Sequence, residues 1–297
     1  MPVIAVIFNP TARGDKARHL RRQLDDLKRQ ARLEPTQHAG HARELAANLV
    51  REGCETVVAA GGDGTVNEVL NGLVDAGADR ARMAVLPLGT VNVFAKELGV
   101  PADFAGAWDV VRRGTERTID LPLAEFGPTG ARQTRAFVQM AGAGLDSRAI
   151  GLVNWKLKKK LGPLAYVWAC VLAMRGPRPR VTVTVGGQTQ TGELVAVGNG
   201  RFLGGRFPVF PHARLDDGQL DVALVPRMTW FAVARIFPAL LRDDFARCRD
   251  VVHLRGDRLS LTSPDPLPIH LEGDNVGELP ADISLRPKAL RVVVPAI

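Results

Sequence analysis

Three glycines enclose an aspartate and precede a threonine in the run Gly61, Gly62, Asp63, Gly64 and Thr65. An apolar, β-branched run at residues 56–60 precedes this turn, and a helical pattern follows it. Glycines let backbone N–H groups approach a ligand without interference from Cβ atoms, and a helix N-terminus favours anionic groups. The spacing therefore predicts a strand-to-helix turn that binds phosphate.

Asp63 is the unusual member of this turn, because a carboxylate beside a phosphate is repulsive. A divalent cation or a substrate hydroxyl between the two groups removes the repulsion, so Asp63 is a candidate for positioning Mg²⁺-ATP. An ordinary turn closed by the Asp63 side chain is the alternative. Thr65 can cap the helix or donate a hydrogen bond to a phosphate. The run is neither a P-loop nor a Gly-x-Gly-x-x-Gly dinucleotide turn.

The elements that must position this turn alternate along the first part of the chain. Strands are predicted at residues 3–8, 56–60 and 84–88, and helices at residues 15–33, 40–52, 66–77, 94–98 and 104–113. Strands that alternate with helices imply a parallel sheet covered on both faces. We therefore expect a Rossmann-like α/β domain over residues 1–122.

The pattern changes after Asp120. Short apolar runs separated by Gly, Pro and Asp turns occur at residues 136–140, 180–185, 193–197, 220–225, 251–254, 258–262 and 283–285. This spacing is typical of an antiparallel β-sandwich, which we expect over residues 123–288. The last residues, 289–297, form a strand that can complete the first domain.

Composition limits the class of protein. The chain has 297 residues, is 46% hydrophobic and carries a net charge of +8. No apolar run approaches the ~20 residues that span a bilayer. Three scattered cysteines favour a reducing cytoplasm. The positive charge favours an anionic partner, although it can also reflect a general compositional bias.

The residues around the glycine turn resemble the diacylglycerol kinase catalytic-domain family, which is related to the sphingosine kinases. The resemblance is carried by residues 65–73, TVNEVLNGL, by residues 86–95, LPLGTVNVFA, and by the later pair Asp217-Gly218. It extends over residues 3–295. It implies a bacterial soluble lipid kinase with an N-terminal parallel α/β domain and a C-terminal antiparallel β-sandwich domain.

The resemblance also implies which residues bind ligands. Contacts with ATP are expected from Asn9, Thr36, Gly61, Gly62, Asp63, Gly64, Thr65, Val66, Asn67 and Thr90. A Mg²⁺ ion is expected at the carboxylate of Asp217 and the backbone carbonyls of Arg214 and Gln219. Such oxygen ligands suit a hard cation. A simple Asp-Gly hairpin turn at this position is the alternative.

Two positions depart from the family pattern. Val93 stands where the family commonly has an aspartate. Near the C-terminus the family carries Asp-Gly-Glu, whereas this chain has Glu272, Gly273 and Asp274, so the two acids are interchanged. Each exchange changes the reach of a carboxylate by ~1.5 Å, and a misplacement of about 1 Å can cost ~10²-fold in rate. We assign the catalytic base to Asp274, with Glu272 as the alternative or as a supporting carboxylate.

These features favour an ATP-dependent kinase that phosphorylates the hydroxyl of a lipid alcohol. Diacylglycerol is the first candidate, and phosphatidylglycerol and sphingosine-like or ceramide-like alcohols remain open. A small-molecule kinase resembling NAD kinases is one alternative. A non-catalytic sensor of nucleotide or lipid is another, suggested by Val93 and by the exchanged acids.

Basic residues provide two further hypotheses. Arg13 and Lys16 follow the first strand and are candidates for phosphate contacts. Residues 155–161 contain four lysines between Trp155 and Leu161, a composition that suits docking on an anionic membrane surface or a solvated helix. We expect a cytoplasmic protein with peripheral contact at the inner membrane face and no nucleic-acid partner.

Overall fold

The computed structural model describes residues 4–10, 27–152, 169, 172–205 and 207–296. The chain divides into two compact units, one of residues 1–121 with 288–297 and the other of residues 122–287. Two strands, β5 (Thr115–Phe126) and β18 (Ala281–Val294), pass from one unit into the other. The predicted basic residues Arg13 and Lys16 and the lysine segment 155–161 lie outside the described residues.

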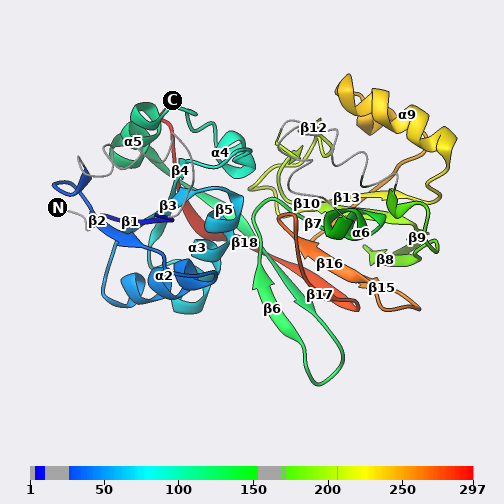
Figure 1. Ribbon diagram of the computed structural model, residues 1–297, viewed down its shortest axis with the longest axis horizontal. Helices are drawn as coiled ribbons and strands as arrows, with labels where there is room; N and C mark the ends of the chain where they lie inside the picture. The colour runs from blue at the N-terminus through cyan, green and yellow to red at the C-terminus, as the bar shows by residue number, and fades with distance from the viewer. Residues whose placement is uncertain (1–3, 11–26, 153–168, 170–171, 206, 297) are drawn as a thin grey trace. The chain divides into compact units, whose positions relative to one another are not determined.

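Unit 1 is built on a parallel sheet in the order β2-β1-β3-β4 (Figure 1). These strands are β1 (Ile4–Phe8), β2 (Arg32–Pro35), β3 (Thr56–Gly61) and β4 (Arg82–Pro87). Val57, Val58 and Ala59 in β3 are fully buried, as expected for a strand covered on both faces. The end of β18 pairs in parallel with β4 at Val292, so the last strand returns to this unit.

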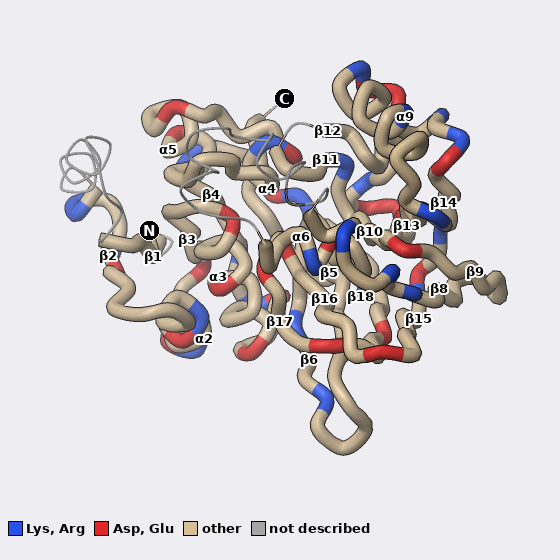
Figure 2. The backbone as a smooth tube through the Cα atoms, turned by 45° about the vertical axis from the view of Figure 1, so that its right-hand side comes forward, with Lys and Arg blue, Asp and Glu red and all other residues tan. Residues whose placement is uncertain are grey.

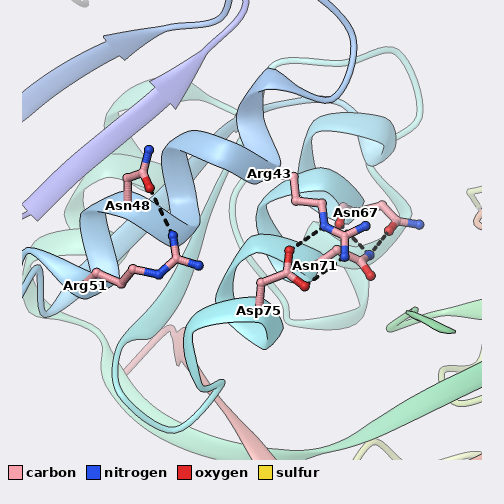
Figure 3. A network of polar contacts seen from close by, with 6 residues as sticks. All are labelled: Arg43, Asn48, Arg51, Asn67, Asn71 and Asp75. Atoms are coloured by element: carbon pink, nitrogen blue, oxygen red, sulfur yellow. Dashed lines mark hydrogen bonds and ion pairs between the residues drawn. The ribbon is translucent and has the colours of Figure 1, made fainter.

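Helices cover the parallel sheet. They are α2 (His41–Arg51), α3 (Asp63–Ala76), α4 (Val93–Glu97) and α5 (Phe104–Arg113). In Figure 1, α2 and α3 lie on one side of the sheet and α5 on the other. Gly72 allows α3 to approach α2 closely, because a Cβ there would lie 2.2 Å from the carbonyl oxygen of Arg43. Arg43 also donates hydrogen bonds of 2.6 and 2.8 Å to Asp75 (Figure 3).

Unit 2 contains a six-stranded antiparallel sheet in the order β14-β13-β10-β7-β16-β17. Its strands are β14 (Val252–Gly256), β13 (Leu220–Val225), β10 (Leu194–Gly198), β7 (Met140–Gly144), β16 (Pro268–Leu271) and β17 (Asp274–Glu278). A second group of strands is β6 (Gln133–Ala136), β8 (Val181–Val185), β9 (Gln188–Gly192) and β15 (Arg258–Thr262), joined by parts of β5 and β18. One buried cluster unites both groups, with Val183 and Leu261 from one and Val197 and Ile269 from the other. The predicted α/β plus β-sandwich fold class is therefore confirmed.

The remaining elements of unit 2 belong to a second core cluster. They are α6 (Leu145–Leu152), α9 (Trp230–Leu241), the short helix η1 (Phe245–Arg247) and the strands β11 (Phe202–Leu203) and β12 (Phe207–Pro208). Their buried side chains include Ala149, Ile236 and Phe245, which pack with Ala196 and Ala223 from the six-stranded sheet. Within the described residues, no helix is both long enough and apolar enough to span a bilayer.

Several predicted elements differ from the structure in their bounds, and two of them show the reason. The helix predicted at residues 15–33 cannot reach its expected end, because β2 begins at Arg32 and pairs with β1. The strand predicted at residues 136–140 is two strands, since β6 ends at Ala136 and β7 begins at Met140. In both places, pairing with a neighbouring strand determines the element, and the local residue pattern does not reveal that neighbour.

Candidate functional site

The glycine turn connects β3 directly to α3 in unit 1. β3 ends at Gly61, Gly62 is the N-cap of α3, and the helix begins at Asp63. A Cβ on Gly61 would lie 2.4 Å from Oγ1 of Thr65, so the first position must be glycine for the turn to close this tightly. The predicted strand-to-helix turn is present, and it begins its helix earlier than the sequence pattern indicated.

A second glycine loop packs against the first. A Cβ on Gly89 would lie 2.4 Å from Cα of Gly62, which shows that the two backbones are in direct contact. Asn92, in the left-handed conformation with φ 55°, closes this loop by accepting from the N–H of Gly89 and donating to its carbonyl, both at 2.9 Å. Thr90 lies exposed between them. The predicted nucleotide residues Gly61, Gly62 and Thr90 thus come from two loops that share one packed backbone contact.

Asp63 joins these loops through its side chain. Its Oδ1 accepts a hydrogen bond of 2.7 Å from the backbone N–H of Val93, at the start of α4. Burial raises the pKa of the Asp63 carboxyl above its usual value, while the N–H groups of Val93, Phe94 and Asn92 oppose that shift. The carboxylate is therefore fixed in position, and Val93 contributes through its backbone N–H.

A cavity of about 340 Å³ lies beside the start of α3, entirely within unit 1. It is lined by Asn9, Thr36, Gln37, His38, Ala39, Ala42, Gly64, Thr65 and Glu68. Four residues predicted to bind nucleotide, Asn9, Thr36, Gly64 and Thr65, are thus brought together. The volume lies near the lower end of the range typical of small-molecule sites, about 300–1,000 Å³.

The other residues predicted to bind nucleotide do not line this cavity. Val66 is buried among the core residues of α3. The side chain of Asn67 accepts a hydrogen bond of 2.6 Å from Asn71, one turn later in the same helix (Figure 3). These two residues stabilise the helix that carries the glycine turn.

Glu68 is a lining residue whose role the sequence did not reveal. Thr65 and Glu68 have the spacing of a capping box, in which an acid bonds back to the start of its own helix. Instead, Glu68 accepts hydrogen bonds from the N–H groups of Gly40 and Ala42 at 2.9 and 3.1 Å, at the start of α2. The carboxylate thereby connects α2 to α3 at the cavity wall.

His38, His41 and Glu44 gather near this cavity with their potential ligand atoms within 4.8 Å of one another. The two imidazole rings stack with their centroids 4.8 Å apart. Nδ1 of His41 accepts the N–H of Gln37 at 3.1 Å, so in the neutral ring the proton is on Nε2. A protonated nitrogen cannot ligate a metal ion. The contacts of His41 therefore do not favour a metal site here.

The acidic turn near the C-terminus joins β16 to β17 in unit 2. Glu272 and Gly273 both have positive φ, 54° and 86°, as in the two-residue turns that connect the strands of an antiparallel hairpin. The Glu272 carboxylate accepts hydrogen bonds of 2.7 Å from the N–H groups of Val138 and Gln139. Asp274 is exposed, and its side chain has no hydrogen bond or ion pair with the part of the chain that the structure describes. Glu272 is thus anchored by two backbone N–H groups, whereas the side chain of Asp274 is exposed.

The Asp-Gly turn at residues 217–218 is also in unit 2. Oδ1 of Asp217 accepts from the N–H of Gln219 at 3.1 Å, and Oδ2 lies 2.7 Å from a guanidinium nitrogen of Arg255. Arg255 also pairs with Asp221 at 3.1 Å. Two of the predicted metal-ligating residues, Asp217 and Gln219, therefore lie on one turn, with a competing arginine beside them.

The charge around this turn indicates whether a cation fits. Asp221 is buried, its Oδ2 has no partner among the described residues, and burial raises the pKa of its carboxyl against the opposing effect of Arg255. Arg255 pairs with both Asp217 and Asp221. Two carboxylates therefore share one guanidinium group, and the pair retains excess negative charge. An unpartnered buried oxygen and excess negative charge fit a hard cation at this turn.

Comparisons with known proteins cover both units. The diacylglycerol kinase catalytic domain matches residues 3–124, and the YegS C-terminal NAD kinase beta sandwich-like domain matches residues 139–294. A diacylglycerol kinase of Bacillus subtilis is 30% identical over 98% of this chain and 95% of its own. A diacylglycerol kinase of Staphylococcus carnosus is 27% identical over 98% of this chain and 94% of its own.

The fold is shared with solved structures as well. The crystal structure of a diacylglycerol kinase from Bacillus anthracis superimposes with a TM-score of 0.77 at 24% identity. It covers 99% of this chain and 97% of the other. At this identity the likeness supports the two-domain fold, and the sequence relatives carry the functional argument.

Proposed function

Because the chain belongs to the diacylglycerol kinase family and is a lipid kinase, we propose that it transfers the γ-phosphoryl group of ATP to the hydroxyl group of diacylglycerol. The observation that carries this proposal is the cavity beside the glycine turn, where Thr36, Gly64 and Thr65 meet at the start of a helix. The relatives named diacylglycerol kinase support the choice of lipid.

The nucleotide site is proposed from the backbone of the turn. The N–H of Val66 already bonds to the carbonyl of Gly62, whereas the first N–H groups of α3 have no partner inside the helix. A Cβ on Gly64 would meet no atom within 4 Å, so this exposed glycine leaves open space for a ligand. The phosphate groups of ATP would bind at Gly64 and Thr65, where the helix N-terminus favours negative charge.

The remaining nucleotide residues have supporting roles in this proposal. Asn9 and Thr36 would contact the nucleoside from the cavity wall. Asp63 would position Mg²⁺-ATP through its charge, and its carboxylate also holds the loop of Gly89 and Thr90 against the glycine turn. Rigid placement of this kind is the main contribution that a protein makes to phosphoryl transfer.

The acceptor hydroxyl requires a base, and we assign this role to Asp274. The hydroxyl oxygen forms a bond to the γ-phosphorus, the bond to the bridging oxygen breaks, and ADP leaves while the carboxylate takes the proton. Asp274 is exposed and unengaged, whereas Glu272 is held by two backbone N–H groups. Glu272 would support the turn, and it is the second candidate for the base.

A second Mg²⁺ is proposed at the carboxylate of Asp217 and the backbone carbonyls of Arg214 and Gln219. The unpartnered Oδ2 of the nearby Asp221 supports this position. When bound, the ion would neutralise these carboxylates and stabilise the turn. Arg255, which pairs with both Asp217 and Asp221, would compete with the ion for the carboxylate of Asp217.

The lipid must be reached in a bilayer, so we propose a cytoplasmic enzyme with peripheral membrane contact. A panel of acceptors tests the function. Purified protein is incubated with radiolabelled ATP and Mg²⁺ and with either NAD or a detergent-dispersed lipid alcohol, which is diacylglycerol, phosphatidylglycerol or ceramide. We expect label in phosphorylated diacylglycerol. Label found only in NADP would identify a small-molecule kinase, and ATP binding without transfer to any acceptor would identify a sensor.

A further inference from the structure

Helix α9 (Trp230–Leu241) presents a large apolar surface to solvent. Trp230 is 59% exposed, Phe231 77% and Leu241 48%, and in the described part of the chain Leu152 is the only other large hydrophobic side chain this exposed. Single exposed apolar residues are ordinary, but three on one helix form a patch that indicates an interaction site. In Figure 1, α9 lies at the periphery of unit 2.

The outward side of α9 is apolar along its whole length. At about 100° per residue, one line contains Trp230, Ala234, Phe237 and Leu241, with Phe231 and Pro238 beside it. On the opposite side, Ala232 and Ile236 are buried in the core of unit 2. The one charged residue of the helix, Arg235, is engaged with Asp250 at 2.6 Å. Burial in unit 2 therefore accounts for only one of the two apolar sides.

Basic residues outnumber acidic residues around this helix, although the exposed Asp243 and Asp244 follow it directly. Residues 227–250 contain five arginines and three aspartates, a net charge of +2. Arg227, Arg242 and Arg249 are exposed, and no salt bridge pairs them with the described residues (basic residues are blue in Figure 2). An apolar helix face with aromatic residues and a basic margin has the chemistry of an interfacial helix on an anionic bilayer.

We propose that α9 docks this protein on an anionic membrane by inserting Trp230, Phe231 and Leu241 at the boundary between headgroups and acyl chains. The inference rests on the proposed function, because a lipid kinase must reach an acceptor that resides in the bilayer. A second copy of the chain fits less well, since two such surfaces would bring the same basic margins together. The helix is distinct from residues 155–161, for which the sequence had suggested membrane contact.

Flotation with lipid vesicles tests the proposal directly. The full chain is mixed with phosphatidylcholine vesicles with and without phosphatidylglycerol, in the absence of ATP. We expect binding that requires the anionic lipid, and we expect Trp230→Ser combined with Phe231→Ser to weaken it at least tenfold. Both side chains are exposed, so the melting temperature of the double variant should be unchanged.

Two variants that each remove one positive charge distinguish a local effect at α9 from an effect of the protein's net charge. Arg242→Gln and Arg258→Gln each remove one exposed arginine, the first next to α9 and the second on β15. We expect only Arg242→Gln to weaken vesicle binding. Equal weakening by both variants would show attraction by net charge alone and would overturn a specific role for α9.

Two further outcomes would overturn the proposal. One is a double variant at Trp230 and Phe231 that floats as well as the wild type, or a wild type that does not float. The other is a wild-type dimer in sedimentation that this double variant abolishes without any vesicle binding, which would assign α9 to self-association. Transfer to detergent-dispersed lipid is measured separately, so vesicle binding without transfer would contradict the proposed function and leave the docking inference intact.

Discussion

Oδ1 of Asp63 and the backbone nitrogen of Val93 are 2.7 Å apart and join the two glycine loops of unit 1. Val93 stands where relatives of this kind were expected to carry an aspartate. This contact is made by the backbone N–H of residue 93, which any residue except proline provides. Asp63 is therefore the acid on which the arrangement of both loops depends.

Asp63→Asn tests whether the charge of this side chain is required. The amide oxygen can still accept from Val93, so the loops should stay joined and the variant should be at least as stable as the wild type at neutral pH. We expect phosphoryl transfer to fall by at least about 100-fold, the scale of losing one electrostatic contact in a transition state. Unchanged turnover would remove the Asp63 charge from the mechanism.

Asp103→Asn provides the matched control for that variant. Asp103 also accepts a backbone N–H at the start of a helix, from Gly106 at 2.8 Å, but it is far in sequence from the glycine turn. We expect Asp103→Asn to leave transfer unchanged. An equal loss of transfer in both variants would indicate a general effect on helix capping.

The pH dependence of stability gives a second test of Asp63. Because burial raises its pKa in the folded protein above 3.8, ionisation costs stability as the pH rises through the folded pKa. Asp63→Asn cannot ionise. The free energy of unfolding of the variant, relative to wild type, should therefore increase as the pH rises above 3.8. Urea titrations at a series of pH values measure this difference, and a constant difference would contradict the burial of the charge.

The fold class could be predicted from sequence because the apolar runs follow simple periods. The buried run of β3 and the turn that follows it depend only on neighbouring residues. The strand β2 was missed because Arg32 and Glu34 are charged, and only pairing with β1 makes this segment a strand. Edge strands of this kind carry little local signal.

Site residues could be predicted from sequence where they lie in one segment of the chain. Contacts between segments that are distant in sequence could not be predicted. Gly64 and Thr65 lie on the turn that was predicted to bind phosphate. The contact of Glu68 with Gly40 spans 28 residues, and the contact of Glu272 with Val138 spans 134. Such pairs depend on tertiary folding, so the sequence could name the residues of the acidic turn and could not show which one is anchored.

Substitution of the glycines should separate stability from ligand binding. Gly61→Ala would place a Cβ 2.4 Å from Oγ1 of Thr65, and we expect a loss of about 1–3 kcal/mol in stability. Gly64→Ala meets no atom within 4 Å and lies in α3, so its stability should be unchanged or higher while its affinity for ATP falls. Thermal unfolding and calorimetric titration with ATP measure the two effects. Normal ATP affinity in Gly64→Ala would move the phosphate site away from this residue.

The two acids of the C-terminal turn should respond differently. Asp274→Asn should lower transfer by about 100-fold or more, a range typical of losing a general base, without changing the melting temperature. Glu272→Gln retains an oxygen that can accept from Val138 and Gln139, so its loss should stay within about tenfold. Steady-state kinetics with saturating lipid compare them. Full activity in Asp274→Asn with a large loss in Glu272→Gln would assign the base to Glu272.

Addition of Mg²⁺ tests the second ion independently of catalysis. A bound ion stabilises the folded state, so Mg²⁺ should raise the melting temperature of the wild type. Asp217→Asn should abolish that increase. Asp257→Asn is the control, because Asp257 is exposed in the turn between β14 and β15, and it should respond as the wild type does. An equal increase in all three proteins would exclude the turn at Asp217 as the site.

The most direct test of the central claim is transfer of label from γ-labelled ATP to diacylglycerol in detergent micelles. Wild-type protein should produce a labelled lipid that depends on time, enzyme and Mg²⁺, and Asp63→Asn and Asp274→Asn should produce almost none without any loss of thermal stability. Wild-type protein that binds ATP and leaves the lipid unlabelled would contradict the account.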